Sequence, residues 1–277
     1  PVLRAAGERS DRCLATGPRR ARPQLTEERY TVNPKHLLPM SLRDVLRPTY
    51  QKALRAWQES RLSPKPQSWR EGRAKAWSSP SAEALLDQAG TDFGITQVPF
   101  EILGLLDKLR ALQPKTVVEV GTHKGGNSFL FCHALASTER VVGVDLCVQN
   151  AAKLIHYARP GQRYFALHGD SQTQAMKARV VQRLAGRSVD FLFIDGDHSY
   201  AGVKADFELY APLVRRGGII ALHDIVADHR TRFGRDTGCY AGEVYRYWAE
   251  LKSRYRTDEL VRDPEQDGFG IGVVYVD

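Results

Sequence analysis

The feature that most constrains the fold is a regular alternation of short apolar runs with amphipathic segments from Val98 onward. Five apolar runs, at 116–120, 141–144, 164–167, 189–194 and 218–222, are separated by segments whose apolar residues recur at helical spacing. Strands that alternate with helices favour a doubly wound, Rossmann-like α/β sheet that is mostly parallel. Two later runs, near 259–261 and 271–276, follow the last predicted helix. We therefore expect seven strands with an antiparallel C-terminal edge.

The first 90 residues differ in composition from the rest. Residues 1–80 hold 17 Lys and Arg against 7 Asp and Glu, so the net charge of +8 resides in this part of the chain. Helical spacing of apolar residues predicts helix over 41–59, broken into two pieces at Pro48, and a short helix over 82–88. We predict a basic arm and helical cover over 1–90 and the sheet domain over 91–277. The sheet domain is nearly neutral and lacks interleaved basic and aromatic residues, so no nucleic-acid partner is expected.

Cysteine usage and hydropathy favour a cytoplasmic protein. The four cysteines form no CxxC pair, which indicates neither a zinc site nor a disulfide framework. No apolar run approaches the roughly 20 residues that cross a bilayer, and no signal peptide is visible. We expect no membrane partner. The helical N-terminal region is a plausible contact surface for a homo-oligomer.

Two apolar runs end abruptly in chemistry-bearing side chains. The run 191–194 is followed by Asp195, Asp197 and His198, and the run 218–222 by His223 and Asp224. In an open parallel sheet, the ligand crevice lies outside the carboxyl ends of the strands. The sequence therefore predicts a site where these two strands end.

The three earlier runs end in residues suited to a cofactor. The first leads into a turn with Gly121, Gly125 and Gly126, where glycine permits a sharp bend and a close backbone approach. This spacing departs from the G-x-G-x-x-G pattern of dinucleotide sites. Asp145 ends the second run, where a carboxylate can accept hydrogen bonds from a ribose, and 168–171 end the third. The recurrence at successive strand ends favours an adenosine-bearing cofactor.

These residues together resemble a known family. Glu119 with Gly121, Asp145, residues 169–171, the strand end 194–198 and the turn 216–218 look like class I S-adenosylmethionine-dependent methyltransferases. More narrowly, 193–200 with 222–224 resemble the O-methyltransferases of cephalosporin biosynthesis and of rhamnosyl and macrolide sugars. The resemblance covers about residues 95–277.

The resemblance implies a set of cofactor contacts. Glu119 and Gly121, with Thr122 and Gly125 of the same turn, would line the methionine side of S-adenosylmethionine. The other implied contacts are Asp145 at the ribose, Asp170 and Ser171 at the adenine, and Gln97 and Asp195 beside the cofactor.

The macrolide-sugar group binds a divalent metal, which implies a metal site here as well. Asp195 and Asp224 match two of its ligands, but His223 stands where that group has a carboxylate. Because Mg²⁺ prefers oxygen donors, three outcomes stay open: weaker Mg²⁺ binding, a shift towards Mn²⁺ or another transition metal, or no metal.

Methyl transfer to an alcohol requires removal of the hydroxyl proton. His198 is our predicted general base because it lies three residues beyond Asp195, and His223 is the alternative. The predicted function is an O-methyltransferase that acts on a hydroxyl of a small molecule, such as a sugar of a glycosylated natural product, as in antibiotic biosynthesis, or a nucleotide sugar.

Two other functions are consistent with parts of the sequence. Tyr200-x-x-x-Lys204 with Ser188 mimics the catalytic set of NAD-dependent short-chain dehydrogenases. A six-residue strand separates Ser188 from Tyr200 by roughly 20 Å, however, so they are not expected to share a substrate. The second alternative is a non-catalytic cofactor-binding module whose basic arm contacts a partner.

Overall fold

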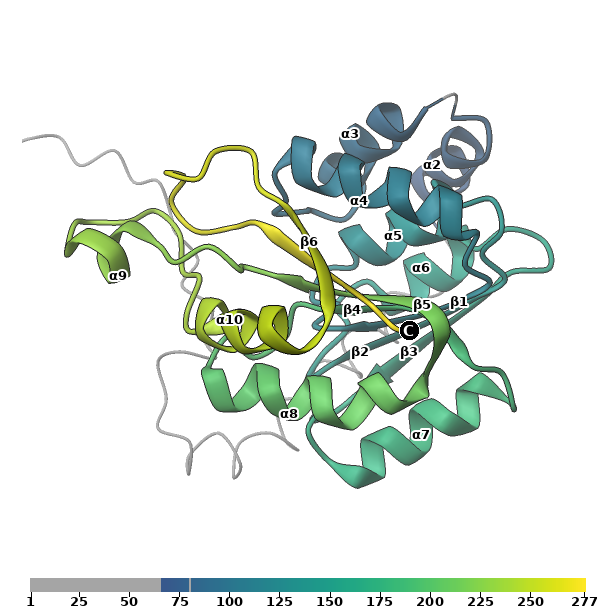
Figure 1. Ribbon diagram of the computed structural model, residues 1–277. Coiled ribbons are helices and arrows are strands. Elements are labelled where there is room, and N and C mark those ends of the chain that lie inside the picture. The colour runs from purple at the N-terminus through teal and green to yellow at the C-terminus, as the bar shows by residue number, and fades with distance from the viewer. Residues whose placement is uncertain (1–65, 80) are drawn as a thin grey trace, which may run out of the picture. The chain divides into compact units, whose positions relative to one another are not determined.

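Residues 66–79 and 81–277 are described by the computed structural model (Figure 1). Their centre is one seven-stranded sheet with the order β3-β2-β1-β4-β5-β7-β6. The first five strands pair in parallel, whereas β7 pairs antiparallel with both β5 and β6. The predicted sheet and its antiparallel C-terminal edge are confirmed. The strands are β1 (Thr116–Val120), β2 (Arg140–Asp145), β3 (Arg163–His168), β4 (Val189–Ile194), β5 (Val214–His223), β6 (Arg256–Leu260) and β7 (Ile271–Tyr275).

Helices cover both faces of this sheet (Figure 1). Alternate residues of a strand point to opposite faces, so each strand contributes to two apolar layers. Phe191 and Phe193 of β4 pack with α3, α4 and α5, whereas Leu192 and Ile194 pack with α7, α8 and α10. The helices on the first face are α2 (Gln67–Trp77), α3 (Ala82–Asp92), α4 (Pro99–Leu112), α5 (Gly126–His133) and α6 (Ala151–Tyr157); those on the second are α7 (Gln174–Leu184), α8 (Tyr200–Tyr210) and α10 (Val244–Arg254).

The described part of the N-terminal region packs onto the first face. Ser81 caps α3, because its hydroxyl accepts a hydrogen bond from the Ala84 amide. Trp77 of α2 donates to the Tyr157 carbonyl over 2.9 Å, and the Tyr157 hydroxyl donates to Asp92 of α3 over 3.1 Å. The helix predicted over 41–59 lies outside the described residues.

Three segments differ from the sequence expectation. Helix α2 was not predicted separately, because its residues show little helical periodicity. The short α9 (His229–Phe233) was not predicted from the sequence, and it begins where the Asp228 side chain accepts from the Thr231 amide. Strand β5 begins at Val214 rather than at 218. Val214 pairs with Val189 of β4, and the pairing register shifts between Val189 and Phe191.

The pairing register aligns the strand ends that carry the predicted site. Val120 of β1 pairs with Ile194 of β4, which pairs with Leu222 of β5. The next residues of all three strands therefore emerge at one edge. Within the described ranges, no helix is long and apolar enough to span a bilayer.

Candidate active site

The turn after β1 is built so that backbone alone fills the space beside β4. Gly121 has φ +92°, and a Cβ there would lie 1.9 Å from the Asp195 carbonyl oxygen. Only glycine fits such a position without moving the neighbouring strand end. Asp145 holds the same turn from β2, because its carboxylate accepts from the amides of His123 and Cys147 over 2.9 and 2.8 Å.

A cavity of about 220 Å³ opens over this turn. Among the described residues, the Gln97 Oε1 and Asn127 Oδ1 atoms are buried and have no hydrogen-bond partner. Buried polar atoms of that kind usually face a ligand or water. The cavity is lined by Gly94, Ile95, Thr96, Gln97, Gly121, Thr122, His123, Lys124, Gly125, Gly126, Asn127 and Asp195.

The structure brings together five of the predicted cofactor residues in this lining: Gln97, Gly121, Thr122, Gly125 and Asp195. Asp145, Asp170 and Ser171 lie outside it, at the ends of β2 and β3. Sequence reasoning missed Asn127, although its position directly after two glycines at a helix start was a usable signal.

Glu119 lies fully buried beneath the cavity. The Ser128 hydroxyl donates to its carboxylate, and the Ser128 and Tyr164 hydroxyls are 3.1 Å apart. Burial disfavours the charged form and raises the pKa of Glu119 to about 8. The carboxyl group is therefore mostly neutral at pH 7 unless a cation approaches it.

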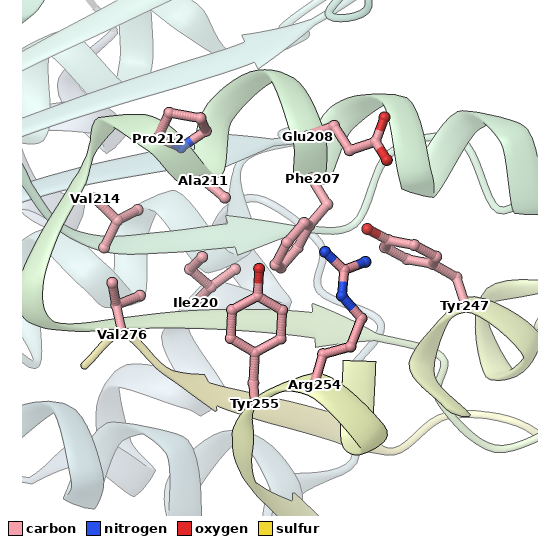
Figure 2. Close-up of a pocket in the computed structure, with 10 residues that line it drawn as sticks. All are labelled: Phe207, Glu208, Ala211, Pro212, Val214, Ile220, Tyr247, Arg254, Tyr255 and Val276. Atoms are coloured by element: carbon pink, nitrogen blue, oxygen red, sulfur yellow. The ribbon is translucent and has the colours of Figure 1, made fainter. Parts of the chain in front are cut away.

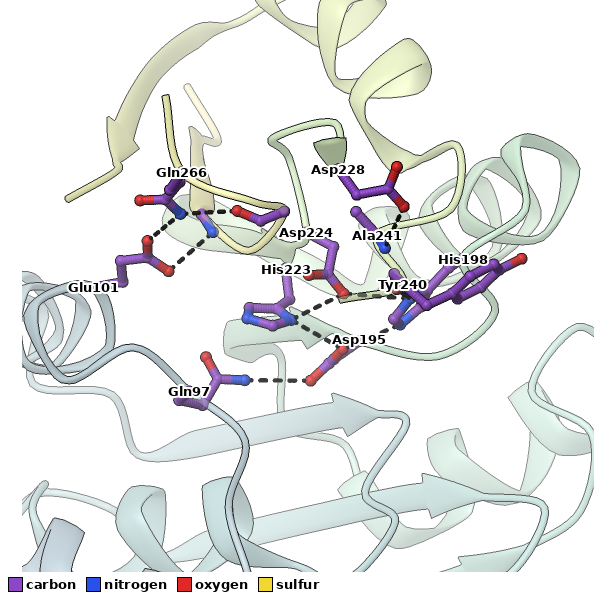
Figure 3. A network of polar contacts seen from close by, with 12 residues as sticks. Gln97, Glu101, Asp195, His198, His223, Asp224, Asp228, Tyr240, Ala241 and Gln266 are labelled. Atoms are coloured by element: carbon purple, nitrogen blue, oxygen red, sulfur yellow. Dashed lines mark hydrogen bonds and ion pairs between the residues drawn. The ribbon is translucent and has the colours of Figure 1, made fainter. Parts of the chain in front are cut away.

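A second group of side chains gathers where β4 and β5 end (Figure 3). His198 Nδ1 lies 3.2 Å from Asp224 Oδ2, and His198 Nε2 lies 3.4 Å from Asp195 Oδ1. His223 Nδ1 lies 3.3 Å from each of the same two carboxylate oxygens. Ligand atoms of Asp195, His198 and Asp224 fall within 4.8 Å of one another, so they could hold a metal ion. We call Asp195, His198, His223 and Asp224 the His/Asp cluster.

The His/Asp cluster favours charged imidazoles when it holds no cation. Burial opposes the charge on His198, but the Asp224 and Asp195 carboxylates outweigh it and raise the pKa of His198 to about 9. The same balance raises the pKa of His223 well above its usual value. Burial would raise the pKa of Asp195, yet the two imidazoles lower it below its usual range. The two carboxylates thus favour the charged form of both imidazoles.

Local backbone geometry fixes the cluster. Asp224 has φ +62°, a left-handed conformation that Asp tolerates better than most residues and that is common at functional sites. The Glu243 amide donates to the His198 carbonyl over 2.7 Å. A Cβ at Gly242, which has φ +65°, would lie 2.4 Å from that carbonyl oxygen. The segment before α10 therefore packs directly against His198.

Tyr240 belongs to the same segment and was not predicted as a site residue. Its ring stacks on His198 with 6.2 Å between centroids and 11° between planes. Its carbonyl oxygen lies 3.2 Å from His198 Nδ1. Nothing in the local sequence signals this contact, which joins positions 42 residues apart.

The dehydrogenase-like residues do not share a site. Ser188 precedes β4 and Tyr200 begins α8 after it, so the strand separates them. The Tyr200 hydroxyl donates to Glu250 over 2.5 Å. A larger cavity, of about 390 Å³, lies away from the His/Asp cluster, beside Val214 at the start of β5 (Figure 2). It contains none of the predicted site residues.

Comparisons with known proteins agree with the fold. Residues 118–225 match a family model described as a methyltransferase domain. The uncharacterised protein y4gI of Sinorhizobium fredii is 31% identical over 173 residues, which are 59% of this chain and 17% of that protein. The rhamnosyl O-methyltransferase of Mycobacterium tuberculosis (strain ATCC 25618 / H37Rv) is 28% identical over 153 residues, 54% of this chain and 62% of that protein. The chain thus spans less than two thirds of these relatives.

Among solved structures, the MycE methyltransferase of the mycinamycin biosynthetic pathway, in complex with Mg, SAH and mycinamycin VI, superposes with a TM-score of 0.50. The alignment covers 72% of this chain and 55% of that one at 17% identity. At this identity, the likeness concerns the fold.

Proposed function

Because the chain carries a class I S-adenosylmethionine-dependent methyltransferase domain, we propose that it transfers the methyl group of S-adenosylmethionine to a hydroxyl of a small molecule. The observation that carries the proposal is the position of Asp195. This residue lines the glycine-walled cavity and also belongs to the His/Asp cluster. A cofactor in the cavity would therefore lie directly beside groups that handle protons and cations.

The cavity residues suit the methionine part of the cofactor. Gly121, Thr122 and Gly125 supply close backbone, and the Gln97 and Asn127 oxygens are available as acceptors. Glu119 lies beneath, where a cofactor ammonium group would favour its ionised form. We assign Asp145 to the ribose, and Asp170 with Ser171 to the adenine. When bound, the cofactor supplies an electrophilic methyl group on sulfur.

The His/Asp cluster suits proton removal from the acceptor. In an in-line displacement, the acceptor oxygen forms a bond to the methyl carbon as the carbon–sulfur bond breaks, and the hydroxyl proton must leave. The Tyr240 carbonyl favours a proton on His198 Nδ1. A cation on the Asp195 carboxylate, which faces Nε2, would leave that nitrogen with the lone pair that accepts. We therefore assign His198 as the general base and Tyr240 as the residue that orients it.

A divalent cation fits between the two carboxylates. Asp195 and Asp224 are 17% and 5% exposed and lie within ligand distance of each other. Such an ion would acidify an acceptor hydroxyl and would offset the negative charge that keeps His198 protonated. We propose Asp195, Asp224 and His223 as its ligands.

The acceptor class that we propose is a sugar hydroxyl on a glycosylated natural product. The support is the rhamnosyl O-methyltransferase among the relatives and the mycinamycin VI bound by MycE. The boundary near residue 90 between a helical cover and the methyltransferase domain stays a prediction, as does a cytoplasmic location.

The test begins with the cofactor and uses the full chain. Calorimetric titration should show saturable binding of S-adenosylhomocysteine and S-adenosylmethionine and none of NAD. Saturable binding of NAD alone would overturn the proposal in favour of an oxidoreductase.

The second part follows tritium from labelled S-adenosylmethionine into a panel of rhamnosides and macrolide glycosides. His198→Ala should lower transfer by about 100-fold or more, the usual contribution of a general base. His229→Ala, on α9 outside the His/Asp cluster, is the matched control and should retain transfer. Full turnover in His198→Ala would remove that residue from the base role.

A further inference from the structure

We propose that the His/Asp cluster selects Zn²⁺ or a related late first-row transition-metal ion over Mg²⁺, and that His223 is the ligand that sets this preference. The inference deepens the proposed function and rests on its metal site. Asp195 Oδ1, Asp224 Oδ2 and His223 Nδ1 form the ligand set, and His198 stays beside it as the proton acceptor.

The ligand atoms differ in which ions they prefer. Mg²⁺ takes oxygen ligands in a near-ideal octahedron and keeps several waters, whereas an imidazole nitrogen suits Zn²⁺ and other late first-row ions. Two carboxylates and one imidazole leave a fourth position open, the pattern of catalytic rather than structural zinc sites. The open position beside His198 is where an acceptor oxygen would bind.

His223 is buried and faces both carboxylates of the cluster. The residue is 5% exposed, and its Nδ1 lies in ion-pair range of Asp195 and Asp224 (Figure 3). Neither contact has hydrogen-bond geometry within the described part of the chain. An ion bound by all three groups would give Nδ1 and both carboxylates a shared partner.

The distances between these ligand atoms suit one shared ion. His223 Nδ1 lies 3.3 Å from Asp195 Oδ1 and 3.3 Å from Asp224 Oδ2. Ligands bonded at about 2.0–2.2 Å to one ion lie no more than about 4 Å apart. The two observed nitrogen-to-oxygen separations therefore allow all three atoms to bind a single ion.

The experiment measures ion binding directly and needs no acceptor. The full chain is stripped with a chelator and titrated separately with ZnCl₂, MnCl₂ and MgCl₂ in a calorimeter, and bound Mn²⁺ is counted from the loss of its free paramagnetic resonance signal. We expect one ion per chain, with Zn²⁺ bound at least about 100-fold more tightly than Mg²⁺ and Mn²⁺ intermediate between them. Equal or tighter Mg²⁺ binding, or no binding of any ion, overturns the inference.

The variants assign the preference to His223. His223→Glu supplies a carboxylate and should reduce the preference for Zn²⁺ over Mg²⁺ by about tenfold or more. His229→Glu makes the same change on α9, outside the His/Asp cluster, and should leave the preference unchanged. If His223→Glu misfolds by circular dichroism, the near-isosteric His223→Asn takes its place and should weaken Zn²⁺ binding about tenfold. An unchanged preference in a folded variant overturns the inference.

Failure here and failure of the proposed function give different results. Loss of the ion preference with intact S-adenosylhomocysteine binding would reject the transition-metal assignment alone. Absence of S-adenosylhomocysteine binding with the ion preference retained would reject methyl transfer alone.

Discussion

The two halves of the site differ in the chemical groups that form them. The cofactor half, at the end of β1, is made of backbone and small residues packed against the neighbouring strand, as the 1.9 Å approach at Gly121 shows. The acceptor half, at the ends of β4 and β5, is made of charged side chains 3.2–3.4 Å apart. A larger side chain in the cofactor half should therefore weaken folding and cofactor binding. A change of charge in the acceptor half should alter ion binding and leave cofactor binding unchanged.

The largest expected effect is at Gly121. Gly121→Ala would force a Cβ into the Asp195 carbonyl at a backbone conformation that alanine rarely adopts. We expect a loss of about 3 kcal/mol or more in the free energy of unfolding and about 100-fold weaker S-adenosylhomocysteine binding. Urea denaturation and calorimetry measure the two quantities.

Gly161→Ala is the matched control. Gly161 has φ +83°, but a Cβ there would meet no atom of the described residues within 4 Å. The backbone penalty alone should cost about 1–2 kcal/mol and leave cofactor binding intact. Equal losses in both variants would show that the close approach to Asp195 plays no part.

The next variant tests whether the cofactor half and the acceptor half bind their ligands independently. Asp224→Asn keeps the shape and the left-handed backbone but removes one of the two negative charges in the His/Asp cluster. We expect divalent-ion affinity to fall by about tenfold or more while S-adenosylhomocysteine affinity changes less than about threefold. Calorimetric titration of both ligands checks this.

Asp197→Asn serves as the control, because Asp197 lies near the cluster but accepts from the Ser199 amide instead. It should leave ion affinity unchanged. A parallel fall in ion and cofactor affinity for Asp224→Asn would contradict the division into two halves.

The halves also differ in how far the sequence predicted them. Each polar residue that directly follows an apolar strand, such as Asp195 or Asp224, emerges at the predicted edge because parallel strands align their carboxyl ends. Contacts made by the segment before α10 were not predictable, since Tyr240 and Gly242 reach His198 only through tertiary packing. The first residues of β5, 214–217, were not predicted for the same reason, because pairing with β4 extends the strand beyond its apolar run.

A smaller effect concerns the stability of protein stripped of divalent ions. The pKa of His198 is about 9 in the folded chain against an ordinary value of 6.5. The folded state therefore binds this proton more tightly, so the stabilisation is complete below pH 6.5 and is lost as the pH rises towards about 9. We expect a loss on the order of 1–3 kcal/mol, measured by urea denaturation across that range.

His198→Gln should show a weaker pH dependence over the same window. The variant is needed because burial of Glu119, whose pKa is about 8, also lowers stability as the pH rises. Identical slopes for the two proteins would mean that the carboxylates do not hold the His198 proton.

The smallest effect lies at the junction of the acceptor half with α8. The Ser199 hydroxyl caps this helix by accepting from the Gly202 amide over 3.0 Å, one residue after His198. Ser199→Ala should cost about 1 kcal/mol, as should Thr173→Ala, which removes the equivalent cap of α7 away from the cluster. If the strand ends and the segment before α10 hold His198, ion affinity stays unchanged in both variants. A tenfold loss of ion affinity in Ser199→Ala alone would instead make the α8 cap part of the acceptor half.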